Sequence, residues 1–199
     1  RRGEELGKRN LRAMTAPELE TFRGGRAHDR VHADPSPAGR GEVGTTQRSG
    51  EVPVVAGAGV VPLDQPNPTH WASAGQLRKP ADHYASPKIV VVKTGSVVRA
   101  GVDQRGLVTL QSVYNVHPHR SGLAWAQFLC GVLSCQEVQR RFVRPHTSGK
   151  KVFPQITQTL LASIRIPMPT DDVVDKISAA VASRDPEALD ACTRAWFAR

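Results

Sequence analysis

Residues 86–118 carry many polar side chains that could contact nucleic acid. Six of them are candidate base or phosphate contacts: Lys93, Thr94, Arg99, Arg105, Gln111 and Ser112. Gln104 and Asn115 add further hydrogen-bonding groups in the same stretch, and a second candidate cluster follows at Lys150, Lys151 and Gln155. Side chains of these types bind phosphate oxygens and the edges of bases.

Catalytic chemistry is harder to find in the sequence. A methyl-donor pocket needs a glycine-rich turn after a strand with an acidic residue beyond it, and neither is present. The carboxylate cluster with which a nuclease holds Mg²⁺ and the serine elbow of a hydrolase are absent too. His28 and His32 have helical spacing for a metal, but the surrounding Pro and Gly disfavour a helix there, and Pro118 separates His117 from His119. We therefore expect no catalytic residue, no cofactor and no metal in this chain.

The candidate contacts must be positioned by strands. Residues 88–93 form a short β-branched run that is typical of a strand buried on both faces. Two further β-rich segments, residues 96–102 and 107–116, flank a turn at residues 103–106, in which Gly106 can adopt a positive φ. This pattern predicts a hairpin. Trp71 and Tyr84 are more typical of core or loop anchors than of base-stacking platforms.

A long helix should follow the strands. Ser121 is a suitable N-cap, and apolar residues at helical spacing predict a helix from residue 123 to about residue 142. One face should pack on the sheet, and the opposite face should carry Gln127, Gln139, Arg140 and Arg141. Beyond this helix, residues 144–151 form a basic loop that could hold phosphates, although a solvated surface loop is an equal alternative.

The remaining chain predicts shorter elements. Residues 157–162 favour a helix, and residues 164–166 favour an edge strand because Pro167 and Pro169 cannot donate to a central ladder. Thr170 and the Asp185-Pro186 pair mark the starts of two C-terminal helices. The predicted fold is α+β, with a twisted, mostly antiparallel sheet, a long packing helix and C-terminal helices.

Composition narrows the class of partner. There are 27 Lys and Arg against 18 Asp and Glu, and this net charge of +9 favours a polyanionic partner.

Residues 24–50 are rich in Gly, Arg, Pro and Ser and predict a flexible loop. The three cysteines, Cys130, Cys135 and Cys192, suit neither a disulfide framework nor a metal site, so free thiols in a cytoplasmic protein are expected. We expect no membrane association.

Five sequence motifs in order resemble one family, the target-recognition domain of Taq-type adenine-specific DNA methyltransferases and restriction-modification enzymes. They are RGEELGK at residues 2–8, PKIVVVKTG at 87–95, LQSVYNV at 110–116, FPQI at 153–156 and LLASIRIPMP at 160–169. A helix with Leu133-Ser134 lies between the third and fourth motifs, where the family has a similar helix. Asn67-Pro68-Thr69-His70 is not the Asn-Pro-Pro-Tyr motif of adenine methyltransferase catalysis, since it lacks the aromatic residue.

This resemblance implies a non-catalytic domain that recognises a target sequence in double-stranded DNA. The methyltransferase catalytic domain or subunit, with its S-adenosylmethionine, would lie outside the chain, and a first residue other than Met suggests a piece of a longer polypeptide. We expect a basic N-terminal segment at residues 1–22, a flexible loop at 23–50, the recognition domain at 51–169 and a helical pair at 170–199.

A different class of function remains open on the sequence alone. The chain could be a protein-interaction module that assembles a restriction or phage-defence complex. Salt-dependent binding to duplex DNA separates the two functions, because only DNA binding releases condensed counterions.

Overall fold

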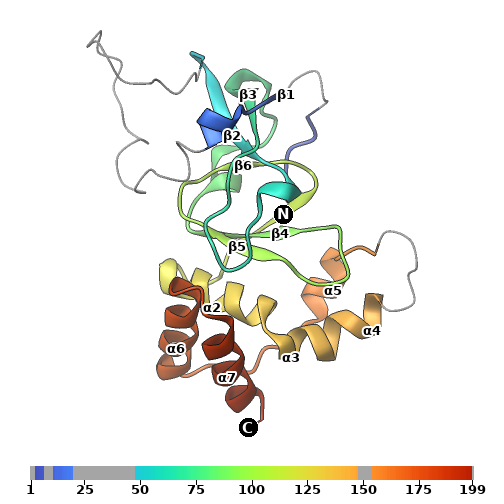
Figure 1. Ribbon diagram of the computed structural model, residues 1–199, viewed down its shortest axis with the longest axis vertical. Coiled ribbons are helices and arrows are strands. Elements are labelled where there is room, and N and C mark those ends of the chain that lie inside the picture. The colour runs from blue at the N-terminus through green and yellow to red at the C-terminus, as the bar shows by residue number, and fades with distance from the viewer. Residues whose placement is uncertain (1–2, 7–10, 20–47, 148–153, 199) are drawn as a thin grey trace.

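The computed structural model describes residues 3–6, 11–19, 48–147 and 154–198, and it stacks them in three layers (Figure 1). One sheet forms the first layer and a second sheet the middle layer, and helices cover the far face of the second sheet. The predicted α+β class is confirmed, although the strands form two sheets. The predicted flexible loop at residues 24–50 lies almost entirely outside the described residues, as do His28 and His32.

The first sheet has the strand order β1-β3-β2-β6. Its strands are β1 (Leu11–Ala13), β2 (Glu51–Val55), β3 (His70–Ser73) and β6 (Val108–Thr109). The β1–β3 and β2–β3 pairs are antiparallel, whereas β2 and β6 are parallel. Trp71 lies in β3 and Tyr84 packs against this sheet, and both are buried, so their prediction as core or loop anchors is confirmed.

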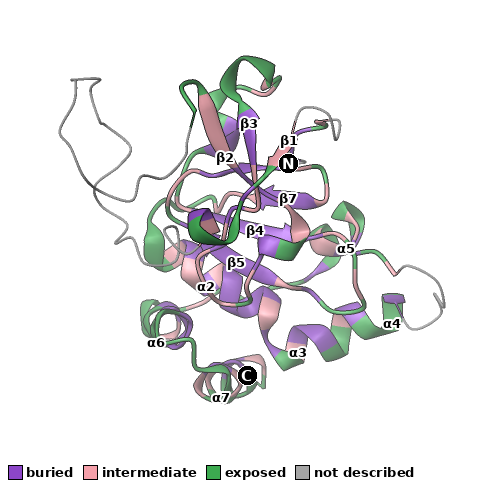
Figure 2. Cartoon of the chain, turned by 45° about the horizontal axis from the view of Figure 1, so that its top comes forward, coloured by how far each residue is buried: buried purple, intermediate pink, exposed green. Residues whose placement is uncertain are grey.

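The second sheet has the order β5-β4-β7 and is antiparallel throughout. It consists of β4 (Lys88–Val92), β5 (Ala100–Asp103) and β7 (Val113–Val116). In β4, Ile89 and Val91 face the helices, and Val90 and Val92 face the first sheet. This central strand is buried on both faces, as its β-branched sequence predicted (Figure 2).

The predicted hairpin at residues 103–106 is wrong. The hairpin forms one step earlier, between β4 and β5, and the chain after Gly106 crosses to the first sheet. The buried Asp103 carboxylate accepts hydrogen bonds from the backbone N–H of Arg105 and of Leu107, and this turns the chain away from β5. Gly106 does adopt a positive φ of 69°.

The helical layer begins with α2 (Leu123–Ser134), whose N-cap is Gly122 rather than Ser121. The predicted single helix is interrupted at Cys135, which has an extended backbone, and it continues as α3 (Gln136–Val138), the π-helical η5 (Gln139–Val143) and α4 (Arg144–Thr147). Asp190 stabilises the break by accepting a hydrogen bond from the Gln136 N–H at 2.9 Å.

The C-terminal helices pack on α2. These are α6 (Asp171–Ala182) and α7 (Pro186–Phe197), and each begins where the sequence predicted. A Cβ atom at Gly131 of α2 would lie only 2.7 to 2.9 Å from Ile177, Val181 and Leu189, so the absence of a side chain permits this close approach. α5 (Gln158–Ser163) is capped by Thr157, but the edge strand predicted at residues 164–166 does not form.

The structure also describes a helical turn at residues 16–19 and three short 3-10 helices, η2 (Gly57–Gly59), η3 (Ala74–Gln76) and η4 (Ala81–Tyr84). Among the helices that the structure describes, every one is too short or too polar to cross a lipid bilayer.

Candidate nucleic-acid interface

The β4–β5 turn, residues 93–99, lies at one end of the second sheet. The backbone of this turn is bound by the segment that precedes α5. Gly95 N–H donates to the Pro154 carbonyl at 2.9 Å, and Ile156 N–H donates to the Lys93 carbonyl at 2.7 Å. Gln155 forms an isolated bridge with Thr94. Two sequence motifs that are separated by about 60 residues are therefore joined here through backbone hydrogen bonds.

The helical layer fixes the other side of this turn. The buried Gln139 side chain accepts a hydrogen bond from the Val98 N–H at 3.0 Å and donates to the Val98 carbonyl at 3.4 Å. The Thr147 hydroxyl donates to the Ser96 carbonyl at 3.3 Å. Gln139 was predicted to face outward, and this is wrong because the helix break at Cys135 changes which residues of the next segment face the sheet.

The loop before β7 brings two more candidates to the same end of the sheet. The Lys93 N–H donates to the Ser112 carbonyl at 3.0 Å, and the Ser112 hydroxyl accepts from the Gly57 N–H at 3.2 Å. Gln111 is exposed, and its Nε2 donates to the Glu5 carboxylate at 2.9 Å. Because a carboxylate only accepts, the amide oxygen of Gln111 points away from Glu5, and among the described residues no group donates a hydrogen bond to it.

Six predicted contacts therefore gather at one end of the second sheet. We name this the end surface, and it consists of Lys93, Thr94, Arg99, Gln111, Ser112 and Gln155. Thr94, Gln111 and Gln155 are exposed, and the other three are half-buried. The Lys93 ammonium lies 4.8 Å from the centre of the Tyr114 ring. The carbonyl of Arg99 accepts from the Val92 N–H, which places Arg99 opposite the end of β4.

Lys150 and Lys151 lie outside the described residues. The described residues on either side of that gap, Thr147 and Pro154, both contact the β4–β5 turn through the hydrogen bonds given above.

Arg105 lies at the opposite end of the sheet. The register pairs Asp103 with Lys88, the first residue of β4, whereas the end surface is built around its last residues. The Arg105 Nη2 donates to the Pro66 carbonyl at 2.7 Å. Burial lowers the pKa of this guanidinium, and the nearby Asp103 and Asp64 oppose that shift. The structure therefore does not bring Arg105 together with the other candidates.

Asn115 proves to be structural. It is fully buried, accepts from the Thr109 hydroxyl at 3.0 Å and donates to the His83 carbonyl at 3.2 Å. A polar side chain at this position links β7 to the first sheet and to η4. Its prediction as a group available to a ligand is wrong, because it occupies a position of β7 that faces the inter-sheet layer.

Sequence reasoning missed a buried carboxylate that positions the end surface. Glu4 is only 1% exposed, and its Oε1 accepts from the Tyr84 hydroxyl and from the backbone N–H of Arg78 and Lys79. Burial and the Glu4 hydrogen bond raise the pKa of the Tyr84 hydroxyl far above its ordinary value. The Glu4 carbonyl accepts from the Gln111 N–H at 2.7 Å. The signal in the sequence that could have identified Glu4 is its place in the first family motif, RGEELGK at residues 2–8.

The described residues contain no group of three or more His, Cys, Asp or Glu that could hold a metal ion. The glycine-containing turn after β2 can be compared with the turn of a methyl-donor site. The strand β2 does lead into Gly57–Gly59, but this is a three-residue 3-10 helix, and no α-helix follows it to receive a cofactor.

Comparison with known protein families matches residues 62–167 to the TaqI-like C-terminal specificity domain. None of the curated proteins matches the chain. The matched region contains β4, β5, β7 and α2, and it also contains every residue of the end surface. It covers more than half of the 199 residues. The chain therefore belongs to the family of TaqI-like C-terminal specificity domains, as its sequence motifs predicted.

Proposed function

We propose that this chain gives target specificity to an adenine-specific DNA methyltransferase or restriction-modification enzyme by binding double-stranded DNA through the end surface. The catalytic domain and its S-adenosylmethionine would belong to another part of the polypeptide or to a partner subunit. No residue of this chain is assigned a catalytic role, and the setting would be the cytoplasm.

The observation that carries the proposal is the convergence of the end surface within the matched region. Residues from three separate stretches, 93–99, 111–112 and 155, meet at one end of the second sheet. Backbone hydrogen bonds hold all three stretches, so the backbone of the end surface is fixed independently of its side chains. Rigid support of this kind is what base-specific hydrogen bonding requires.

The side-chain chemistry suits both parts of DNA recognition. Lys93 and Arg99 are cations that can contact phosphates, and Lys150 and Lys151, which lie outside the described residues, would add to this function. Thr94, Gln111 and Gln155 are exposed neutral groups that can accept and donate. A glutamine can bind the N6 and N7 edge of adenine in the major groove. Arg105 stays a separate prediction, since it lies at the other end of the sheet.

Salt-dependent binding to duplex DNA tests the proposal directly. The 199-residue chain should bind duplexes with an affinity that falls as the salt concentration rises, since displaced counterions accompany each phosphate contact. Selection from a random-sequence pool, with the catalytic domain restored, should yield a preferred target. Binding that is absent, or that does not depend on salt, would reject DNA recognition and favour an assembly module.

A further inference from the structure

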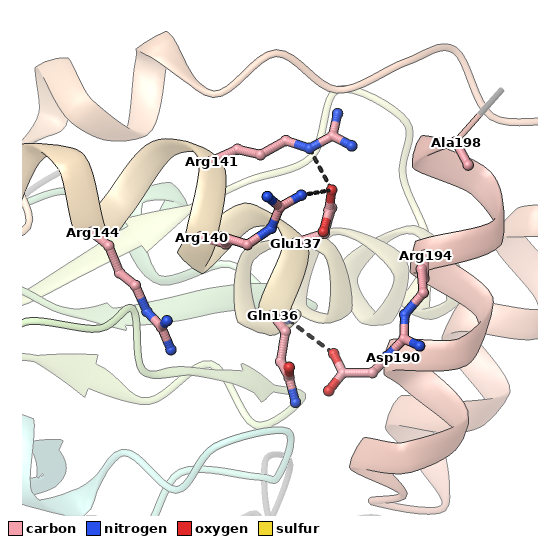
Figure 3. Close-up of a pocket in the computed structure, with 8 residues that line it drawn as sticks. All are labelled: Gln136, Glu137, Arg140, Arg141, Arg144, Asp190, Arg194 and Ala198. Carbon is pink, nitrogen blue, oxygen red and sulfur yellow. Dashed lines mark hydrogen bonds and ion pairs between the residues drawn. The ribbon is translucent and has the colours of Figure 1, made fainter.

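A groove of about 380 Å³ lies between the α3–η5–α4 segment and α7, within the helical layer (Figure 3). Four arginines line it: Arg140, Arg141 and Arg144 from the first segment, and Arg194 from α7. Glu137 and Asp190 are the acidic residues of its lining. Guanidinium groups from two separate elements therefore face one concave site.

The two carboxylates are already bound within the protein. Glu137 accepts from Arg140 at 2.8 Å and from Arg141, and these hydrogen bonds hold the pKa of its carboxyl below the usual range. Asp190 accepts from the Gln136 N–H at the start of α3. Internal hydrogen bonds thus engage both acidic groups, and the groove keeps an excess of positive charge.

Arg144 and Arg194 carry that excess. Both are exposed, and within the described part of the chain neither guanidinium takes part in a hydrogen bond or an ion pair. A guanidinium can bind the oxygens of a phosphate through two parallel hydrogen bonds, which makes arginine well suited to nucleic-acid backbones.

The groove is also connected to the end surface. The helical segment that carries Arg140, Arg141 and Arg144 ends at Thr147, whose hydroxyl contacts Ser96 in the β4–β5 turn. At a rise of about 1.5 Å per helical residue, the seven steps from Arg140 to Thr147 span roughly 10 Å. That length of roughly 10 Å corresponds to about three base-pair steps of 3.4 Å along a DNA duplex. A duplex that contacts the end surface and follows this helical segment would reach the groove.

We propose that the arginine groove binds a phosphate of the DNA backbone outside the recognised sequence, mainly through Arg144 and Arg194. The contact adds affinity for any duplex and carries no sequence preference, because phosphates are the same at every base pair. This proposal rests on the proposed function, since it concerns the same DNA. An acidic segment of a protein partner is the other polyanion that could occupy the groove.

Single variants of the 199-residue chain test the groove. Arg144→Ala and Arg194→Ala should each make log affinity fall less steeply with log salt, by up to about 0.9 in the slope, the value for one lost phosphate contact on duplex DNA. The loss should be equal for target and unrelated duplexes that extend beyond the target on both sides. Lys176→Ala is the matched control, because it also removes one positive charge, from the exposed face of α6, and should leave the slope unchanged. Circular dichroism would verify that each variant is folded.

The possible outcomes are distinct. If the wild-type chain binds DNA in a salt-dependent way and both groove variants keep its slope, the groove proposal is wrong and the proposed function stands. If these variants instead lose binding to polyglutamate and keep DNA binding, the groove serves an acidic protein segment, which also overturns the proposal. If the wild-type chain does not bind DNA at all, the proposed function fails first and this inference fails with it.

Discussion

Gln139 holds the backbone of Val98 on both sides, since its amide accepts from the Val98 N–H and donates to the Val98 carbonyl. The same Nε2 donates to the Leu133 carbonyl at 2.9 Å, one of the carbonyls left free at the end of α2. One buried side chain therefore ties the β4–β5 turn to the helix break. The conformation of the end surface depends on this link.

Replacing Gln139 should destabilise the fold. Gln139→Leu preserves the approximate size and leaves a buried N–H and two carbonyls without their partner, at about 1–3 kcal/mol for an unsatisfied buried group. Urea unfolding should show this loss, and hydrogen exchange at the Val98 N–H should accelerate. Gln127→Leu, at a half-buried position of α2, is the control and should change stability by no more than about 0.5 kcal/mol. Equal stability of the two variants would contradict the anchoring role.

A second prediction concerns the buried pair of Lys88 and Asp103. The Lys88 ammonium donates to Asp103, to the Tyr84 carbonyl at 2.9 Å and to the Leu107 carbonyl at 3.1 Å. Lys88→Met leaves the Asp103 carboxylate buried without its cation, which should cost about 3–5 kcal/mol of the unfolding free energy. Lys176→Met, at an exposed ion pair, should have almost no effect in the same urea titration. A small effect at Lys88 would mean that the backbone donors to Asp103 suffice.

The cysteines should react in a defined order. Burial raises the pKa of the Cys130 thiol to about 12, so it carries very little thiolate at pH 8. Cys135 is also buried with a raised pKa, whereas Cys192 is half-buried. Native alkylation followed by peptide mass spectrometry should find Cys192 modified first. Early modification of Cys130 would show that the core around α2 opens more readily than its burial indicates.

The same raised pKa gives a dependence of stability on pH. The folded state favours the neutral Cys130 thiol. The contribution of this thiol to the free energy of unfolding is therefore complete below the ordinary thiol pKa of 9.0. That contribution is lost as the pH rises toward about 12. Unfolding of Cys130→Ala should depend less on pH across this alkaline range than unfolding of the wild-type chain.

The sequence was sufficient for the elements whose signals are local. The β-branched run of β4 and the residues that mark the starts of α6 and α7 are local signals, and these predictions are confirmed. The sheet switch after Gly106 depends on contacts with β2, which is about 50 residues away in sequence. The pattern of apolar and polar residues within 103–116 therefore does not predict which sheet this segment joins.

The candidate site was predictable to a similar extent. Polar residues beside a buried strand are visible in the sequence, and six of the nine candidates do gather at one end of the sheet. Separating Arg105 from them requires the register of β5 on β4, because a short turn can place its residues at either end of a strand. Glu4 and Gln139 look like surface residues, and only the tertiary hydrogen bonds identify them as internal supports.

The last prediction separates the reading of bases from the binding of phosphates. Gln111→Ala removes an exposed amide whose oxygen is available, so it should relax the preference at one position of the target by about 1–3 kcal/mol and spare non-specific binding. Lys150→Ala with Lys151→Ala should weaken binding to all duplexes alike and lower the salt slope by about one unit per lost phosphate contact. The comparison uses the selected target and a scrambled duplex at several salt concentrations, with the methyltransferase domain restored.

Glu5→Gln tests the support of Gln111, since it weakens the charge-assisted hydrogen bond between the two side chains while leaving Gln111 itself in place. If Gln111→Ala weakens both duplexes equally, the end surface positions the DNA and another part of the enzyme reads the sequence.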